Sequence, residues 1–101
     1  MNKTEIEAKL VGLIQMELKQ SVFTASELRN GRVISWGNIR GREMNLSVRE
    51  NKKRGFRIRV RWNHGCDHSY FSRAGKNLAK TAKKIVWAVS TNNGWDALNN
   101  R

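Results

Sequence analysis

Hydrophobic side chains near the N-terminus recur at the three- to four-residue spacing of one helix face. They are Ile6, Leu10, Leu13, Ile14 and Leu18. Thr4 precedes these residues and can cap the first helical turn, and Glu7, three residues later, can complete a capping box. The pattern predicts a helix over residues 5–19 with one side turned toward a core.

A similar capping pattern at residues 24–27 favours a short helical turn over residues 27–29, which Asn30 and Gly31 then break. From residue 32 the hydrophobic period becomes two, which is typical of strands. The alternation predicts strands at residues 33–36, 44–48, 56–62 and 69–71, separated by turns at 38–41, 51–55 and 63–65 that contain Asn and Gly. We therefore expect an antiparallel meander of three to four strands across about residues 33–72.

The alternation is clearest over residues 56–62. One face of this strand carries Phe56, Ile58, Val60 and Trp62, and the other carries Arg57, Arg59 and Arg61. Successive side chains of a strand point to opposite faces, so the two sets separate completely. We expect Trp62 in the core and the three arginines on an open, solvated face.

A second helical pattern follows Ser72. Its hydrophobic side contains Leu78, Ala82, Ile85, Val86 and Val89. The pattern predicts a helix over about residues 74–91 that packs on the sheet and ends at the Asn and Gly residues of 92–94. We expect Trp87 and Trp95 to fasten this helix and the tail to the body of the protein.

These elements predict an α+β fold with an N-terminal helix, an antiparallel meander and a C-terminal helix packed on the sheet. The 101 residues, of which 39% are hydrophobic, suit one domain over residues 1–101 with one modest core. A single cysteine, Cys66, excludes an internal disulfide framework. No apolar run approaches the roughly 18–20 residues that cross a bilayer, and the first residues do not form a signal-peptide core. We expect a cytoplasmic protein.

The charge of the chain is concentrated in one stretch. Residues 49–84 contain twelve basic and two acidic side chains, which is a net charge of +10 out of +12 for the chain. Clustered Lys and Arg in a strongly basic domain are typical of nucleic-acid binding. The expected contacts come from the arginine strand, the hairpin tip beside it and a lysine ridge on the last helix: Arg49, Lys52, Lys53, Arg54, Arg57, Arg59, Arg61, Lys76, Lys80 and Lys83.

The geometry of each group suits phosphates. Alternate residues of a strand are about 6.6–6.8 Å apart, so the three arginines of residues 56–62 can present guanidinium forks to successive phosphates or to guanine edges. Lys76 and Lys80 are one helical turn apart. Trp36, beside Gly37, can serve either as a core residue or as a contact that stacks on a base.

Catalytic and metal-binding chemistry is not expected. His64, Cys66, Asp67 and His68 form the one cluster with metal-ligand chemistry, but no second Cys or His pair completes a zinc site. We interpret residues 64–68 as a polar turn without metal. The chain has no nucleophile elbow, phosphate-binding glycine loop or paired carboxylates, so we expect neither an enzyme nor a cofactor.

The residues Lys76, Ala79 and Lys80 match the K-x-x-A-K stretch that opens the last helix of double-stranded RNA-binding domains. Together with the order helix, three strands, helix, residues 44–90 resemble that family, which implies duplex RNA as a partner. A three-stranded sheet backed by a helix is also similar to the DNA-binding domains of ethylene-response factors and the arm-binding domains of phage-type integrases. That resemblance implies duplex DNA held against Arg57, Arg59 and Arg61, and duplex DNA is the slightly preferred partner.

Two alternatives stay open. A winged helix would use residues 24–43 as helix-turn-helix and residues 51–55 as the tip of the wing, although Gly37 and Gly41 would weaken its reading helix by about 1 kcal/mol each. A small basic adaptor or inhibitor could instead dock its charged patch on an acidic protein, such as a nucleic-acid-processing enzyme, because charge alone does not separate the two partners. No membrane or small-molecule partner is expected.

Overall fold

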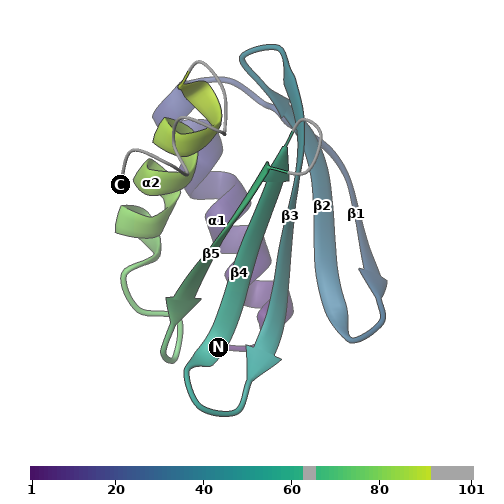
Figure 1. Cartoon of the computed structure of the whole chain (residues 1–101), viewed down its shortest axis with the longest axis vertical. Coiled ribbons are helices and arrows are strands. Elements are labelled where there is room, and N and C mark those ends of the chain that lie inside the picture. The colour runs from purple at the N-terminus through teal and green to yellow at the C-terminus, as the bar shows by residue number, and fades with distance from the viewer. Residues whose placement is uncertain (63–65, 92–101) are drawn as a thin grey trace.

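The described residues form two helices and a five-stranded antiparallel sheet (Figure 1). The computed structural model describes residues 1–62 and 66–91. In chain order the elements are α1 (Lys3–Leu18), β1 (Phe23–Arg29), β2 (Arg32–Ile39), β3 (Arg42–Asn51), β4 (Gly55–Trp62), β5 (Cys66–Ser72) and α2 (Leu78–Ser90). The strands follow one another in space as they do in sequence. The α+β class is confirmed, with one strand more than the expected three to four.

The first helix begins earlier than its predicted cap. Asn2 Oδ1 accepts a hydrogen bond from the Glu5 N–H at 2.9 Å, and Glu5 Oε1 accepts one from the Asn2 N–H at 2.9 Å. The capping box predicted at Thr4 and Glu7 is therefore wrong by two residues. Glu7 is buried instead, and its carboxylate accepts hydrogen bonds from the hydroxyls of Ser26 and Ser35.

The additional strand is β1, where a helical turn was expected. Asn30 and Gly31 both have positive φ, 51° and 75°, as a two-residue hairpin turn requires, and they join β1 directly to β2. The prediction failed because Asn-Gly is a signal for a hairpin as well as for a helix end. Residues 24–43 belong to β1, β2, the start of β3 and the two turns between these strands, so the winged-helix alternative is wrong.

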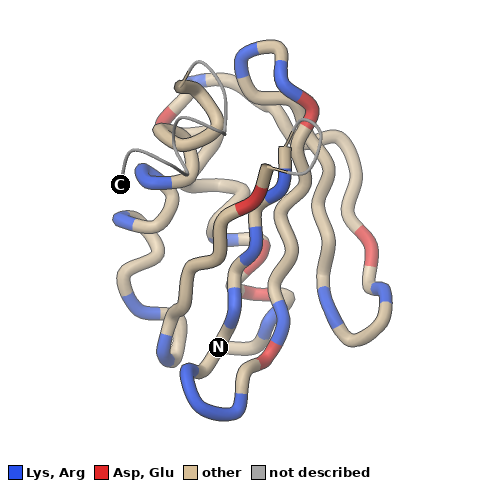
Figure 2. The backbone as a smooth tube through the Cα atoms, in the orientation of Figure 1, with Lys and Arg blue, Asp and Glu red and all other residues tan. Residues whose placement is uncertain are grey.

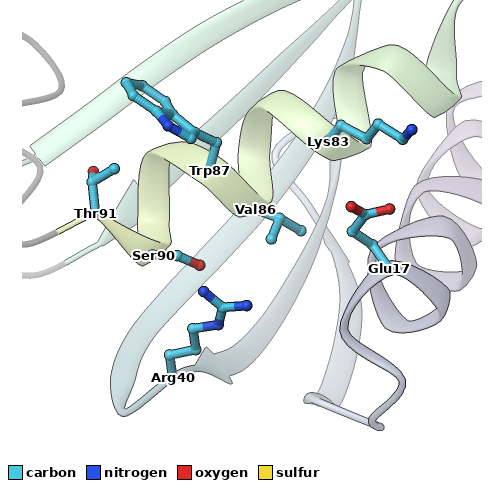
Figure 3. Close-up of a pocket in the computed structure, with 7 residues that line it drawn as sticks. All are labelled: Glu17, Arg40, Lys83, Val86, Trp87, Ser90 and Thr91. Carbon is cyan, nitrogen blue, oxygen red and sulfur yellow. The ribbon is translucent and has the colours of Figure 1, made fainter.

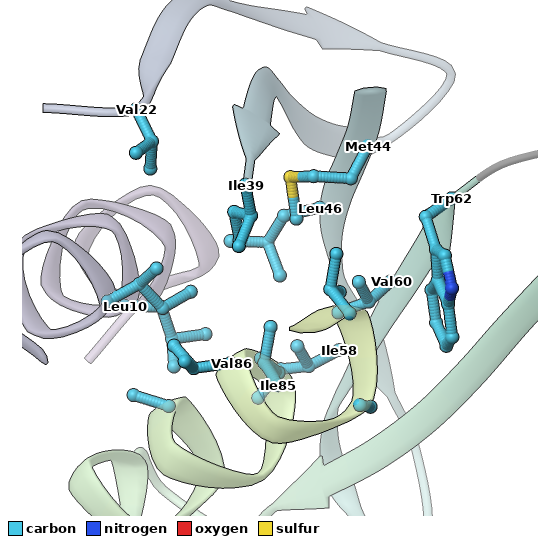
Figure 4. Packing of buried hydrophobic residues seen from close by; sticks show 14 of the residues in the cluster. Leu10, Val22, Ile39, Met44, Leu46, Ile58, Val60, Trp62, Ile85 and Val86 are labelled. Atoms are coloured by element: carbon cyan, nitrogen blue, oxygen red, sulfur yellow. The ribbon is translucent and has the colours of Figure 1, made fainter. Parts of the chain in front are cut away.

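Both helices cover the same face of the sheet, and the core lies between the two layers (Figures 1 and 4). Leu10 and Ile14 of α1 and Ile85 of α2 are fully buried. The sheet contributes alternate residues, including Leu46 and Val48 from β3 and Ile58, Val60 and Trp62 from β4. Trp62 is 1% exposed, which confirms its predicted place in the core.

The second half of the chain differs from the expectations in three places. Cys66, Asp67 and His68 belong to β5, so they do not form the expected polar turn; residues 63–65 lie outside the described residues. The last helix begins at Leu78, about one turn later than predicted, because residues 73–77 form turns in which Ala74 and Asn77 have positive φ. The indole of Trp87 is 60% exposed and does not fasten the helix to the sheet. Trp95 and the predicted helix end at 92–94 lie outside the described residues.

Gly37 allows the link between α1 and β1 to cross close to β2. A Cβ atom at this position would lie 2.6 Å from the carbonyl oxygen of Val22. That carbonyl accepts a hydrogen bond from the Asn38 N–H at 2.9 Å, so the approach is part of the strand pairing. Among the described residues, no helix is long and apolar enough to span a membrane.

Candidate nucleic-acid interface

The face of the sheet that points away from the helices, here called the open face, carries most of the arginines of the sheet. In β4 the buried Ile58 and Val60 point to the helices, so Arg57, Arg59 and Arg61 point to the open face, as predicted. In the part of the chain that the structure describes, no helix or strand covers this face (Figure 1).

Strand pairing adds arginines that the sequence alone did not bring together. Arg29 lies opposite Arg32, Arg32 opposite Arg49, and Arg49 opposite Arg57. We call these four residues the arginine row. Neighbouring strands are about 4.8 Å apart, so the row extends roughly 14 Å across β1 to β4. Like charges directly opposite one another destabilise a sheet, so the row accumulates a repulsion that an anion would relieve.

Several of the open-face arginines have partners within the chain. Arg59 forms an ion pair with Asp67 at 2.9 Å, and Arg57 donates two hydrogen bonds to the Ser69 hydroxyl at 3.1 and 3.0 Å. Arg29 forms an ion pair with Glu27 of the same strand. Arg61 is exposed and has no ion pair within residues 1–62 and 66–91. The register places only three carboxylates on the open face, Glu27, Glu43 and Asp67, against six arginines.

The turn between β3 and β4 continues the charge beyond the end of the arginine row. Lys52, Lys53 and Arg54 are exposed there, and the tip of this turn is blue in Figure 2. Asn51 Oδ1 accepts hydrogen bonds from the backbone N–H groups of Lys53 and Arg54, at 3.0 and 2.8 Å, which holds the turn. The Arg54 guanidinium lies 4.6 Å from the ring centre of Phe71 in β5. The tip is thus a structured cationic projection beside the open face.

A cavity of about 210 Å³ lies within the open face, around the side chain of Trp36. Ile34 and Ser47 are buried beneath it, and Trp36 is half-buried. The cavity is lined by Arg29, Arg32, Ile34, Trp36, Asn45, Ser47, Arg59 and Arg61. The Arg29 guanidinium lies 5.8 Å from the centre of the Trp36 ring system. Trp36, which the sequence left open as a core residue or as a contact with a base, therefore lies among the cations of the open face.

Sequence reasoning missed Arg29 and Arg32. Period-two alternation in β2 places Arg32, Ile34 and Trp36 on one face, and this signal was present in the sequence. Arg29 was missed because residues 27–29 were expected to form a helical turn and not a strand. Both residues join the site only through the pairing of β1 with β2 and of β2 with β3.

The lysines predicted on the last helix lie elsewhere. Lys80 and Lys83 are exposed on α2, in the helix layer, and Lys76 is exposed in the turn between β5 and α2, so none of the three lies on a strand of the open face. Lys83 lines a second cavity of about 440 Å³ with Glu17, Arg40, Val86, Trp87, Ser90 and Thr91 (Figure 3). The structure therefore divides the predicted cationic site between two sides of the molecule.

The described residues contain no cluster of three or more His, Cys, Asp or Glu side chains. No family model, curated protein or solved structure matches the chain. The resemblances to double-stranded RNA-binding domains and to three-stranded DNA-binding sheets stay predictions.

Proposed function

We propose that this protein is a non-enzymatic nucleic-acid-binding domain whose contact surface is the open face together with the β3–β4 tip. The observation that carries the proposal is the arginine row, with Arg59 and Arg61 beside it, on a face that no described element covers. Guanidinium groups bind phosphates with two parallel hydrogen bonds, and a row of them suits a regularly charged polymer.

The sheet is too broad to enter a DNA groove as a whole. Five strands about 4.8 Å apart span roughly 19 Å, whereas the major groove is about 12 Å wide and admits a helix or a two-stranded ribbon. Duplex DNA, the partner favoured by the sequence, would have to receive the β3–β4 ribbon with Lys52, Lys53 and Arg54 at its tip. Two modes of binding are therefore distinct. In one, the β3–β4 tip enters a groove of duplex DNA; in the other, the nucleic acid lies across the open face.

The experiment is a fluorescence-anisotropy titration of labelled oligonucleotides against the parent protein and two matched variants. Arg61→Ala removes an exposed cation from the open face, and Lys80→Ala removes one from the helix layer. We expect Arg61→Ala to weaken binding several-fold and Lys80→Ala to leave it unchanged. With about five phosphates contacted, log affinity should fall against log salt with a slope of about -4 to -5.

Two results would contradict the proposal: no binding of any oligonucleotide at low salt, or equal losses in the two variants. If Lys80→Ala alone weakens binding and duplex RNA is preferred, the helix-layer lysines are the site, as the double-stranded RNA-binding resemblance implies.

One observation favours the second candidate, an adaptor or inhibitor that docks on an acidic protein. The edge strand β1 is exposed over Thr24–Arg29, and Leu28 is 69% exposed, so a protein could pair with this edge beside the arginine row. A pull-down repeated after nuclease treatment separates the candidates. A partner that survives nuclease favours the adaptor, and a partner that is lost favours nucleic-acid binding.

A further inference from the structure

We infer that the open face binds single-stranded nucleic acid and that the Trp36 cavity holds one unpaired base. This inference rests on the proposed function and names its substrate class. It starts from the position of Trp36, which lies on β2 between β1 and β3 and pairs with Ala25 on one side and Asn45 on the other.

The lining of the cavity matches a nucleobase. A base has apolar faces and a polar edge, and the cavity joins the Trp36 ring and the Ile34 side chain to the amide of Asn45 and the hydroxyl of Ser47. Its volume of about 210 Å³ is smaller than the roughly 300–1,000 Å³ of pockets that enclose a whole drug-sized ligand. It therefore suits one planar group and not a complete cofactor.

The cations around the cavity suit the backbone on both sides of that base. Arg29 and Arg32 reach it from β1 and β2, and Arg59 and Arg61 reach it from β4. Arg29 lies over the Trp36 ring at 5.8 Å, so this ring already accepts a planar cationic group. A base that stacks on the same face takes the place of that guanidinium. Aromatic platforms flanked by cations are the usual means of binding single strands without sequence preference.

A duplex cannot use this cavity. The faces of paired bases are stacked on their neighbours, so only base edges are available in the grooves. Trp36 does not lie at a projecting tip that could wedge between base pairs, because strands flank it on both sides. A single strand can lie across the whole breadth of the open face and turn one base toward Trp36.

The test compares fluorescein-labelled single-stranded DNA of about 12 nucleotides, a length within the range of single-strand binding sites, with the same sequence as a duplex. We expect the parent protein to bind the single strand at least tenfold more tightly at equal salt. Trp36→Ala should weaken single-strand binding about 5- to 150-fold, the range that corresponds to the stacking of one base, and Trp36→Phe should retain most of the affinity. Trp87→Ala, which removes an exposed indole from the helix layer, is the matched control and should bind as the parent does.

A change in the ligand tests the same contact without altering the protein. An abasic single strand keeps every phosphate and lacks the bases, so we expect the parent protein to bind it more weakly than the normal strand. Trp36→Ala should discriminate less between the two strands. This comparison stays valid even if one tryptophan variant folds poorly.

The possible failures are distinguishable. If the parent protein binds no oligonucleotide, the proposed function itself is wrong. If it binds duplex DNA as tightly as the single strand, or binds normal and abasic strands equally, the proposed function stands and this inference is overturned.

Discussion

At the scale of single residues, Glu7 departs most from what its position in the sequence suggests. It lies in the first turns of a helix, where a glutamate ordinarily caps or faces water, yet its side chain is buried against β1 and β2. Its carboxylate accepts a hydrogen bond from Ser26 at 3.1 Å and another from Ser35, which is 1% exposed. Glu7 therefore connects α1 to the two strands that complete the arginine row.

We expect Glu7→Ala to lower the free energy of unfolding by about 1–3 kcal/mol, because the buried Ser35 hydroxyl loses its acceptor. Glu7→Gln keeps a side-chain oxygen as acceptor and should cost less. The measurement is urea unfolding followed by circular dichroism. Glu17→Ala, an exposed glutamate of the same helix, is the control. Equal effects of Glu7→Ala and Glu17→Ala would show that the buried contact does not stabilise the fold.

At the scale of elements, turns and crossings control how the sheet is built. The Asn30-Gly31 turn decides that residues 23–29 form a strand and pair with β2. Gly37 of β2 lets the link between α1 and β1 lie close to β2, because a side chain at position 37 would collide with the Val22 carbonyl oxygen. These two local features allow β1 to pair with β2, which brings Arg29 opposite Arg32.

Two glycine substitutions should have opposite effects on stability. Gly37→Ala forces a Cβ atom to 2.6 Å from the Val22 oxygen and should destabilise by about 1–3 kcal/mol. Gly12, within α1, has nothing within 4 Å of its Cβ position, so Gly12→Ala should stabilise by about 0.5–1 kcal/mol through helix propensity. Thermal unfolding of both variants provides the comparison. A Gly37→Ala protein as stable as the parent would mean that the crossing can move at little cost.

At the scale of the whole molecule, the charge of +12 is divided between two layers. The open face carries most of the arginines of the sheet, and α2 in the helix layer carries Lys80, Lys83 and Lys84. Figure 2 shows basic positions along both the strands and α2. Repulsion among like charges on each side opposes folding, and dissolved salt screens it. The free protein should therefore be more stable when its charges are screened.

We expect the melting temperature to rise when NaCl increases from about 50 to about 500 mM, because the screening length shortens from above 10 Å toward a few Å. Arg49→Gln removes the member of the arginine row that lies between Arg32 and Arg57, and it should make the melting temperature less sensitive to salt. Differential scanning fluorimetry measures both. A melting temperature that falls with NaCl would mean that the ion pairs Arg29–Glu27 and Arg59–Asp67 outweigh the repulsion.

Much of the architecture was predictable because the signals are local. The two helices, the two-sided β4 and the polar turn at residues 51–55 follow from hydrophobic period and turn residues, and the structure confirms each of them within a few residues. The failures have physical reasons. Asn30-Gly31 is compatible with a helix end and with a hairpin turn, so β1 was missed. The sequence offers a capping box at Asn2 and another at Thr4, and only the one at Asn2 forms. The exposure of Trp87 depends on which face of α2 packs on the sheet.

The sequence by itself determined that the chain has a helix at each end of a run of strands in which hydrophobic and polar residues alternate. It also determined that Arg57, Arg59 and Arg61 share one face. Both properties depend on residues close together in the chain. Only the tertiary structure decided that Arg29, Arg32, Arg49 and Arg57 form one row, that Trp36 lies among them, and that the helix lysines lie in the other layer. The reason is that strand register and the face covered by the helices arise from contacts between distant segments, which no local spacing encodes.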